Sequence, residues 1–304
     1  MPSAEQVLQR LEWQVIRPLD GLLQGDYRSL FFGSGLDLAG VREYEPGDDI
    51  RYMDWNITAR LSVPYVRQYM EDREINAWFL LDLTPSVDFG TRTRTKRDLL
   101  VEFVGVVARL LTRRGNRVGA LLYTGRLEGV VRCRSGRLQV LRLLNDLMRP
   151  PAARRSGLTD LGELLEAARA VIARRSLVFV VSDFISTPGW ERLLRTFGRR
   201  HDVVGVRIAD IAEEELPDVG GIFLEDAETG DQLFVDTSDG GLRARFRQLA
   251  DQRKQAVSEA FERAHADLLA LSTEDDLVAA IVRFNALRKE RRRVARAAAA
   301  LPRS

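Results

Sequence analysis

The sequence predicts an α/β fold: a mostly parallel, Rossmann-type central sheet with helices on both faces, a small β-rich segment in front and helices behind. Two runs, 77–81 (AWFLL) and 177–181 (LVFVV), are continuously apolar, which is typical of strands that helices cover on both faces. Stretches with helical periodicity alternate with such runs. An acid follows each run, Asp82 and Asp183, and ligands gather at the carboxyl ends of parallel strands.

The elements fall into three predicted segments. Residues 1–72 begin with a helix and continue with short alternating stretches that predict strands separated by turns. Residues 73–212 form the α/β segment, with predicted strands at 75–83, 117–124, 128–134, 176–184 and 202–210, and helices at 96–114, 138–148, 161–174 and from Trp190. Residues 213–304 predict a hairpin around 227–231 (AETGD), a helix from Gly241 to Leu271, another from Thr273 to Arg288 and a basic tail.

Composition excludes several classes of site. Cys133 is the only cysteine, which excludes an internal disulfide and a zinc site built from cysteines, and two histidines are too few for a His-rich metal centre. No apolar run approaches the roughly 18 residues of a membrane span, and the N-terminal stretch has no signal-peptide core, so we expect a cytoplasmic protein. The net charge of +2 gives no reason to expect specific nucleic-acid binding.

Polar oxygens gather on three loops at the expected ligand-binding edge. Asp82, Thr84 and Ser86 alternate along one tight turn after the first apolar strand, so their side chains can face one point. Thr159, at a helix start, and Asp183, after a later strand, add a hydroxyl and a carboxylate. Such oxygens suit Mg²⁺ or Mn²⁺. Two acids and three hydroxyls leave an octahedral ion short of charge, with a position open for a carboxylate from elsewhere.

The pattern Asp82-x-Thr84-x-Ser86, followed by Thr159 and Asp183, resembles the metal-ion-dependent adhesion site of von Willebrand factor A domains, over roughly residues 75–210. That family usually has serine where Thr84 stands, and threonine keeps the oxygen. The resemblance implies that the hydroxyls touch the metal, that the acids often act through water, and that a partner's Asp or Glu fills the open position. The neighbouring residues Asp160 and Ser182 are candidates to orient this set.

Residues 33–60 (GSGLDLAGVREYEPGDDIRYMDWNITAR) resemble the signature of a bacterial family, domain of unknown function fifty-eight. That resemblance implies a von Willebrand factor A-like domain behind the signature and a MoxR-type AAA+ ATPase as partner. The signature also contains a turn at Pro46 and Gly47 that is rich in arginine and aspartate. Its ion pairs either fix the turn against the α/β segment, which we favour, or form a docking surface for the ATPase.

We therefore expect a non-enzymatic, Mg²⁺-dependent protein-binding module that acts with the ATPase in assembly or maturation of protein complexes, with a client protein supplying the Asp or Glu. Two alternatives stay open: a metal-assisted phosphohydrolase that uses the same acids, and a structural domain with an empty site. A haloacid-dehalogenase-like phosphatase is disfavoured because Thr84 stands where its motif needs an acid. No Gly-x-Ser-x-Gly frame, Gly-x-Gly-x-x-Gly motif or P-loop lysine supports a serine hydrolase or a nucleotide site.

Overall fold

The computed structural model describes residues 2–23, 41–45, 50, 53, 55–61, 63–67, 74–149 and 158–299. The chain divides into two compact units. One consists of residues 1–31 and 75–304, and the other of residues 32–74. The two units are described separately below.

The small unit contains the short strands that the sequence predicts for the lead-in. Strand β1 (Val41–Glu43) pairs antiparallel with β2 (Tyr65–Arg67), and helix α4 (Trp55–Leu61) precedes β2. The Thr58 hydroxyl accepts a hydrogen bond from the backbone N–H of Tyr65 at 3.0 Å, which ties the helix to the strand. The charged turn that begins at Pro46 lies outside the described residues, so its two interpretations stay predictions.

The large unit is built on a six-stranded sheet in the order β10-β7-β6-β3-β4-β5. Its strands are β3 (Asn76–Asp82), β4 (Arg117–Tyr123), β5 (Leu127–Arg134), β6 (Leu177–Ser182), β7 (Asp202–Ala209) and β10 (Asp267–Ser272). All neighbours pair parallel except β4 and β5, which pair antiparallel. Every residue of β6, and every residue of β3 after Asn76, is buried. The predicted mostly parallel sheet is therefore confirmed.

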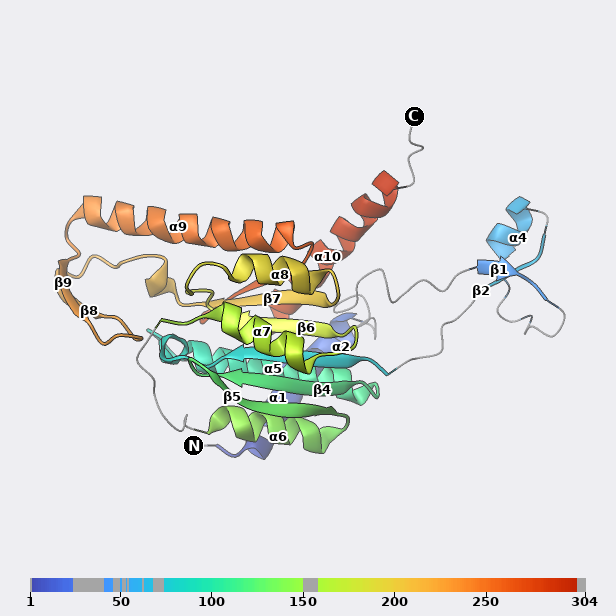
Figure 1. Ribbon diagram of the computed structural model, residues 1–304, viewed down its shortest axis with the longest axis horizontal. Helices are drawn as coiled ribbons and strands as arrows, with labels where there is room; N and C mark the ends of the chain where they lie inside the picture. Colours follow the sequence, from blue (N-terminus) through green and yellow to red (C-terminus); the bar gives the residue numbers. More distant parts are fainter. Residues whose placement is uncertain are drawn as a thin grey trace. The chain divides into compact units, whose positions relative to one another are not determined.

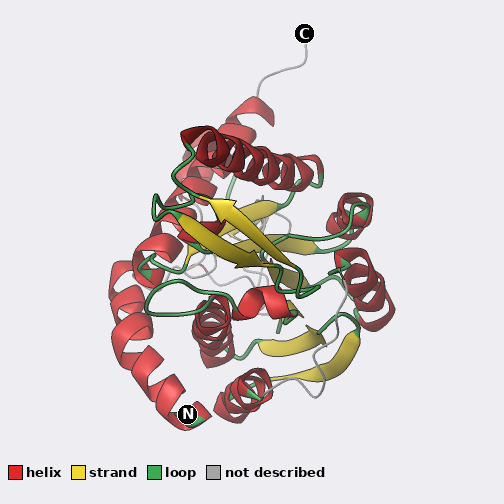
Figure 2. Ribbon diagram, turned by 90° about the vertical axis from the view of Figure 1, so that its left-hand side faces the viewer, coloured by secondary structure: helices red, strands yellow, loops and turns green. Residues whose placement is uncertain are grey.

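Helices cover both faces of this sheet (Figure 2). Helices α7 (Leu161–Val171), α8 (Trp190–Gly198) and α9 (Gly240–Arg263) share one hydrophobic core with the side chains of Trp78 and Leu80. On the opposite face Phe79 stacks on Phe179, and Phe103 of α5 (Lys96–Arg113) meets Phe179 edge-on with ring centroids 6.0 Å apart. Helix α5 in turn contacts α1 (Ala4–Leu11), η1 (Glu12–Ile16) and α6 (Arg137–Met148), whereas α2 (Arg17–Leu23) contacts α10 (Leu277–Ala299).

The edge strand β10 was not expected. The sequence predicted one helix from Gly241 to Leu271, and this prediction was wrong, because α9 ends at Arg263 and the chain re-enters the sheet at Asp267. The turn between them is made by His265, whose φ of 52° lies in the left-handed region that usually favours glycine. The helix after β10 also begins at Leu277, four residues beyond the expected Thr273. The central sheet thus takes one strand from beyond residue 212.

The predicted hairpin is confirmed. Strands β8 (Gly221–Glu225) and β9 (Gln232–Asp236) pair antiparallel, and in Figure 1 they lie at the same end of the sheet as the loop that follows β3. In the part of the chain that the structure describes, no helix is both long and apolar enough to cross a membrane.

Candidate functional site

Asp82 and Ser182 lie next to each other at the carboxyl ends of β3 and β6. These strands are neighbours, with Leu81 opposite Val181, so Asp82 and Ser182 lie side by side at the edge of the sheet. The Ser182 hydroxyl donates a 2.7 Å hydrogen bond to Asp82 Oδ2. Asp82 is fully buried, and a buried carboxylate requires such donors. Ser182 thus orients Asp82, as its position in the sequence suggested.

The turn after β3 presents two hydroxyls beside this carboxylate. Thr84 donates to Asp82 Oδ1 from its hydroxyl at 2.7 Å and from its backbone N–H at 3.1 Å. Pro85 begins the short helix η3 (Pro85–Asp88), which turns the chain so that the hydroxyl oxygen of Ser86 lies 3.3 Å from that of Thr84. Arg97 holds the turn from outside, because its guanidinium bonds to Asp88 and to the Leu83 carbonyl.

Thr159 approaches the same point from another loop. It directly precedes Asp160, the residue that caps helix α7, and its carbonyl accepts a 2.9 Å hydrogen bond from the backbone N–H of Thr187. The Thr159 hydroxyl oxygen lies 3.0 Å from that of Thr84. The Asp160 carboxylate accepts from the backbone N–H groups of Gly162 and Glu163. Within the described residues Asp160 therefore serves the helix cap and makes no hydrogen bond to the hydroxyls.

Asp183 lies beside this cluster, but its carboxylate has a different partner. Its Oδ2 accepts a 2.7 Å hydrogen bond from the ammonium of Lys96, and its Oδ1 accepts from the backbone N–H of Ile185. The same ammonium donates at 2.6 Å to Glu213, in the short helix η4 (Ile211–Glu213). Lys96 is 0% exposed, so this is a buried ion triad. The next residue, Phe184, has a φ of 59°, a strained conformation of the kind that collects at functional sites.

A fourth loop reaches the cluster through Glu228, in the turn of the β8–β9 hairpin. Its Oε1 accepts a 2.7 Å hydrogen bond from the hydroxyl of Thr159. Its Oε2 is buried and has no hydrogen-bond donor in the structure. A buried carboxylate oxygen without a donor is rare and costly, which makes this oxygen a candidate for a ligand to a cation.

The electrostatics of the cluster favour an added positive charge. Burial and, to a smaller extent, repulsion by Asp183 raise the pKa of Asp82 to about 6, although the hydrogen bonds from Ser182 and Thr84 act to lower it. Burial alone would lower the pKa of Lys96, but the carboxylates of Asp183 and Glu213 outweigh it and hold this pKa above its usual range. Lys96 is thus charged and already shared between Asp183 and Glu213, so its hydrogen bonds do not compensate Asp82 or Glu228.

The hydroxyl protons can be placed from these contacts. With both acids ionised, Thr84 gives its single proton to Asp82 and Thr159 gives its proton to Glu228, each over 2.7 Å. The 3.0 Å contact between the two hydroxyl oxygens then holds no proton, so lone pairs face one another. A cation between them removes this repulsion, and neighbouring ligands of an octahedral Mg²⁺ lie about 3 Å apart.

The chemistry of the donors defines which ion would fit. Among the residues that the structure describes, no three or more His, Cys, Asp or Glu side chains are grouped so as to hold a metal. A cation here would depend on the hydroxyls of Thr84, Ser86 and Thr159, with carboxylates beside them. Such an all-oxygen set suits a hard ion such as Mg²⁺ or Mn²⁺ and does not suit zinc or copper.

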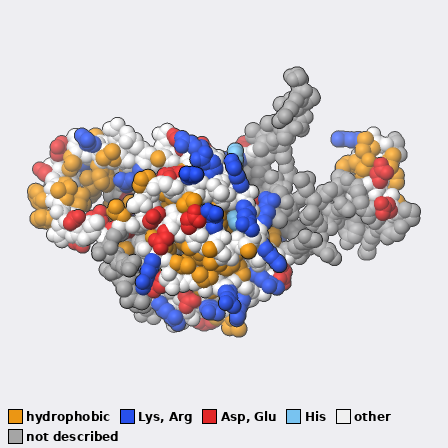
Figure 3. Space-filling view, in the orientation of Figure 1, with side chains coloured by type: hydrophobic (Ala, Val, Ile, Leu, Met, Phe, Trp, Pro, Cys, Tyr) orange, Lys and Arg blue, Asp and Glu red, His pale blue; other side chains and the backbone are white. Residues whose placement is uncertain are grey.

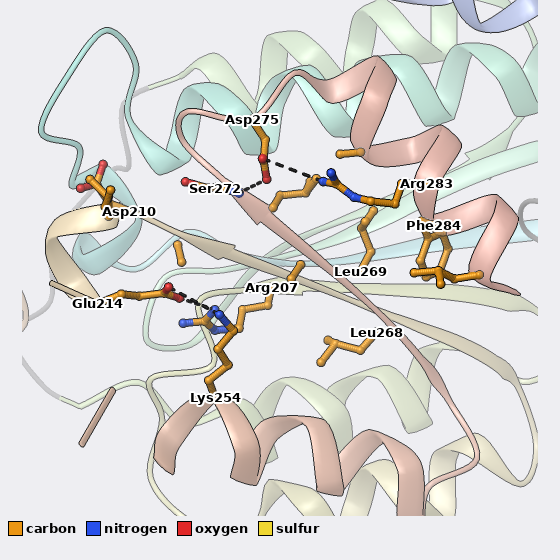
Figure 4. A pocket seen from close by; sticks show the side chains of 16 residues that line it. Arg207, Asp210, Glu214, Lys254, Leu268, Leu269, Ser272, Asp275, Arg283 and Phe284 are labelled. Carbon is orange, nitrogen blue, oxygen red and sulfur yellow. Dashed lines mark hydrogen bonds and ion pairs between the residues drawn. The ribbon is translucent and has the colours of Figure 1, made fainter. Parts of the chain in front are cut away.

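A separate pocket of about 480 Å³ lies along β7 and β10 (Figure 4). Its walls carry ion pairs of their own: Arg207 bonds to Glu214 at 2.8 Å, and Arg283 approaches Asp275 at 4.0 Å. None of the five predicted site residues lines it. The pocket and the hydroxyl cluster are therefore distinct.

The sequence located most of the cluster and missed its charged partners. Contacts of 2.7–3.3 Å between side-chain oxygens connect Asp82, Thr84, Ser86 and Thr159, whereas Asp183 joins through its effect on the pKa of Asp82. Carboxylates near Lys96 could have been predicted from the sequence. A lysine in the first turn of a helix is unfavourable with the helix dipole unless acids lie close to it. The turn that contains Glu228 carried no such signal.

The comparisons agree with the signature at residues 33–60. The family model "Protein of unknown function DUF58" matches residues 40–256. Uncharacterized proteins of Mycobacterium bovis and Mycobacterium tuberculosis are each 38% identical over 288 residues, which is 95% of this chain and 90% of theirs.

Two solved structures cover most of the chain at low identity. They are the conserved hypothetical protein BatB from Bacteroides thetaiotaomicron, with a TM-score of 0.46, and an aerotolerance-related membrane protein from Bacteroides fragilis, with a TM-score of 0.47. Each is 12% identical and covers 71% of this chain and 99% of its own. Similarity of that extent transfers no property. The family match and the mycobacterial relatives, in contrast, are extensive enough to establish that the chain belongs to the DUF58 family.

Proposed function

We propose that this chain is a non-enzymatic protein-binding module that binds Mg²⁺ at the hydroxyl cluster and uses it to capture a carboxylate of a client protein. In this proposal the large unit is a von Willebrand factor A-like domain, and the cluster is its metal-ion-dependent adhesion site. Thr84, Ser86 and Thr159 would hold the ion directly. Asp82 and Asp183 would lie behind these hydroxyls, farther from the ion. The bound ion would supply the positive charge that attracts an acidic side chain.

One observation carries the proposal: the hydroxyl oxygen of Thr84 lies 3.3 Å from that of Ser86 and 3.0 Å from that of Thr159. With both acids ionised, the protons of Thr84 and Thr159 are directed to carboxylates. Hydroxyls that donate outward leave their lone pairs directed inward, as a cation requires. Ser182 fixes Asp82 as the acceptor for Thr84, so the arrangement is held before any ion binds.

The partners remain proposals drawn from the family resemblance. A MoxR-type AAA+ ATPase would supply the energy for assembling or maturing a protein complex, because the chain has no motif for nucleotide binding of its own. The client would contribute an Asp or Glu to the ion. A cytoplasmic location is part of the same proposal.

Calorimetric titration tests the metal site. We expect Mg²⁺ or Mn²⁺ to bind the wild-type protein and to bind Asp82→Asn at least about tenfold more weakly. Residues that hydrogen-bond to the ligands of a metal contribute about 10- to 100-fold to its affinity. Asp239→Asn is the matched control. Asp239 caps helix α9 on the surface by accepting from the backbone N–H of Gly241, and asparagine caps equally well.

Equal heats from the wild type and Asp82→Asn would contradict a metal site at the cluster. A loss of binding in Asp239→Asn as well would mean that the ion binds elsewhere.

A further inference from the structure

The β8–β9 hairpin is exposed along most of its length, yet its turn buries one carboxylate oxygen, Oε2 of Glu228. Hydrophobic side chains gather over the hairpin in Figure 3. Phe223, Leu233 and Phe234 of the hairpin are 60–72% exposed. The pairing of β8 with β9 does not itself require a buried carboxylate. Glu228 in the turn nevertheless directs its carboxylate into the cluster, 69 residues away in sequence from its partner Thr159.

We propose that Glu228 is the chain's own ligand for the open position of the cation, so that the hairpin closes the site against a client until it is released. This inference rests on the proposed metal site and adds its regulation. The client's carboxylate would then have to replace a carboxylate that the protein already supplies.

The turn is built to present this side chain. Asp226 Oδ1 accepts from the backbone N–H groups of Glu228 and Thr229 at 2.8 and 2.9 Å, and the Thr229 hydroxyl donates to Asp231 at 3.0 Å. Gly230, with a φ of 78°, completes the bend. These bonds order the backbone on both sides of Glu228, so little conformational entropy is lost when its side chain docks.

The carboxylate of Glu228 lacks the partners that would otherwise explain its position. One oxygen accepts from Thr159 and the other is buried without a donor. The Lys96 ammonium donates to Asp183 and Glu213, so its hydrogen bonds do not compensate the charge of Glu228. Docking of an ionised Glu228 at this point is favourable when a cation lies between it and the hydroxyls.

The docked turn also explains why the cluster is closed. Thr84 and Thr159 are only 1% and 2% exposed, so an outside carboxylate cannot reach their oxygens in this conformation. A ligand tethered through a short turn competes at an effective concentration on the order of millimolar. A free acidic segment must therefore bind more tightly than Glu228, or the hairpin must be moved first.

The test combines Mg²⁺ titration with hydrogen exchange of residues 221–236. In the wild type we expect Mg²⁺ to slow exchange in the hairpin. In Glu228→Gln we expect a dissociation constant for Mg²⁺ that is at least about tenfold higher, and no slowing of hairpin exchange. Glu225→Gln is the control on the same hairpin, since the Glu225 carboxylate accepts a hydrogen bond from Gln232 on the neighbouring strand and not from the cluster. Acetate should restore Mg²⁺ affinity to Glu228→Ala and leave the wild type unchanged.

The outcomes separate the two proposals. If wild type and Glu228→Gln bind Mg²⁺ equally and hairpin exchange does not respond to the ion, the internal ligand is overturned while the metal site stands. If the wild type binds no Mg²⁺, both fall together.

Discussion

Replacing Lys96 by methionine is expected to lower the free energy of unfolding by about 3–5 kcal/mol, because it leaves the buried Asp183 and the partly buried Glu213 without their shared cation. The Lys96 ammonium lies 2.7 Å from Asp183 and 2.6 Å from Glu213. The pKa of Lys96 is raised in the folded state, so the triad contributes its full stability below the ordinary value of 10.5 and loses it only as the pH rises through the folded-state value. Urea denaturation at pH 7 measures the effect.

Lys254→Met is the control for this substitution. Lys254 is half exposed and lies 3.6 Å from Glu214, a surface pair for which we expect a loss of less than about 1 kcal/mol. If Lys96→Met fails to fold, the double variant Lys96→Met with Asp183→Asn should recover part of the stability, because it removes one of the stranded charges. Equal losses in the two methionine variants would contradict a buried ion triad.

Asp82→Asn is expected to stabilise the metal-free protein at pH 7 and to destabilise it relative to wild type when Mg²⁺ is in excess. Burial and the charge of Asp183 raise the pKa of Asp82 from 3.8 to about 6, which corresponds to at most about 3 kcal/mol of unfavourable free energy in the folded state above pH 6. Weaker hydrogen bonds to Thr84 and Ser182 offset part of this, so we expect a gain of about 1–2 kcal/mol.

The pH dependence of this gain identifies its source. The folded wild type takes up a proton on Asp82 before the unfolded chain does, so the advantage of the variant is greatest above pH 6 and disappears as the pH falls toward 3.8. In Mg²⁺ at a hundredfold excess over its dissociation constant, the wild type should gain about 2.7 kcal/mol and the variant little. Thermal melts with chelator and with Mg²⁺ measure both. A variant that is less stable than the wild type in chelator at every pH would contradict the prediction.

The sequence predicts β3 and β6 because their environment is uniform. Both faces of β3 and β6 are covered, so their residues are apolar without interruption and stand out from the helices. Strand β10 lies at the edge of the sheet and is only partly buried, and neither glycine nor proline separates it from α9. Its pairing with β7 comes from tertiary contact that no local pattern encodes.

The candidate site likewise contains residues that could be predicted from the sequence and residues that could not. Asp82, Thr84 and Ser86 could be predicted because they share one turn at a strand end, and strand ends meet at one edge of a parallel sheet. Lys96 and Glu228 could not, because they reach Asp183 and Thr159 across 87 and 69 residues of chain. Such partners depend on how helices and hairpins pack, which periodicity and turn chemistry leave open.

Anomalous diffraction from a crystal grown in Mn²⁺ tests the central claim most directly. We predict one strong peak at the carboxyl ends of β3 and β6, within bonding distance of the hydroxyl oxygens of Thr84, Ser86 and Thr159. Ordered side chains at these positions with no peak between them would contradict the account.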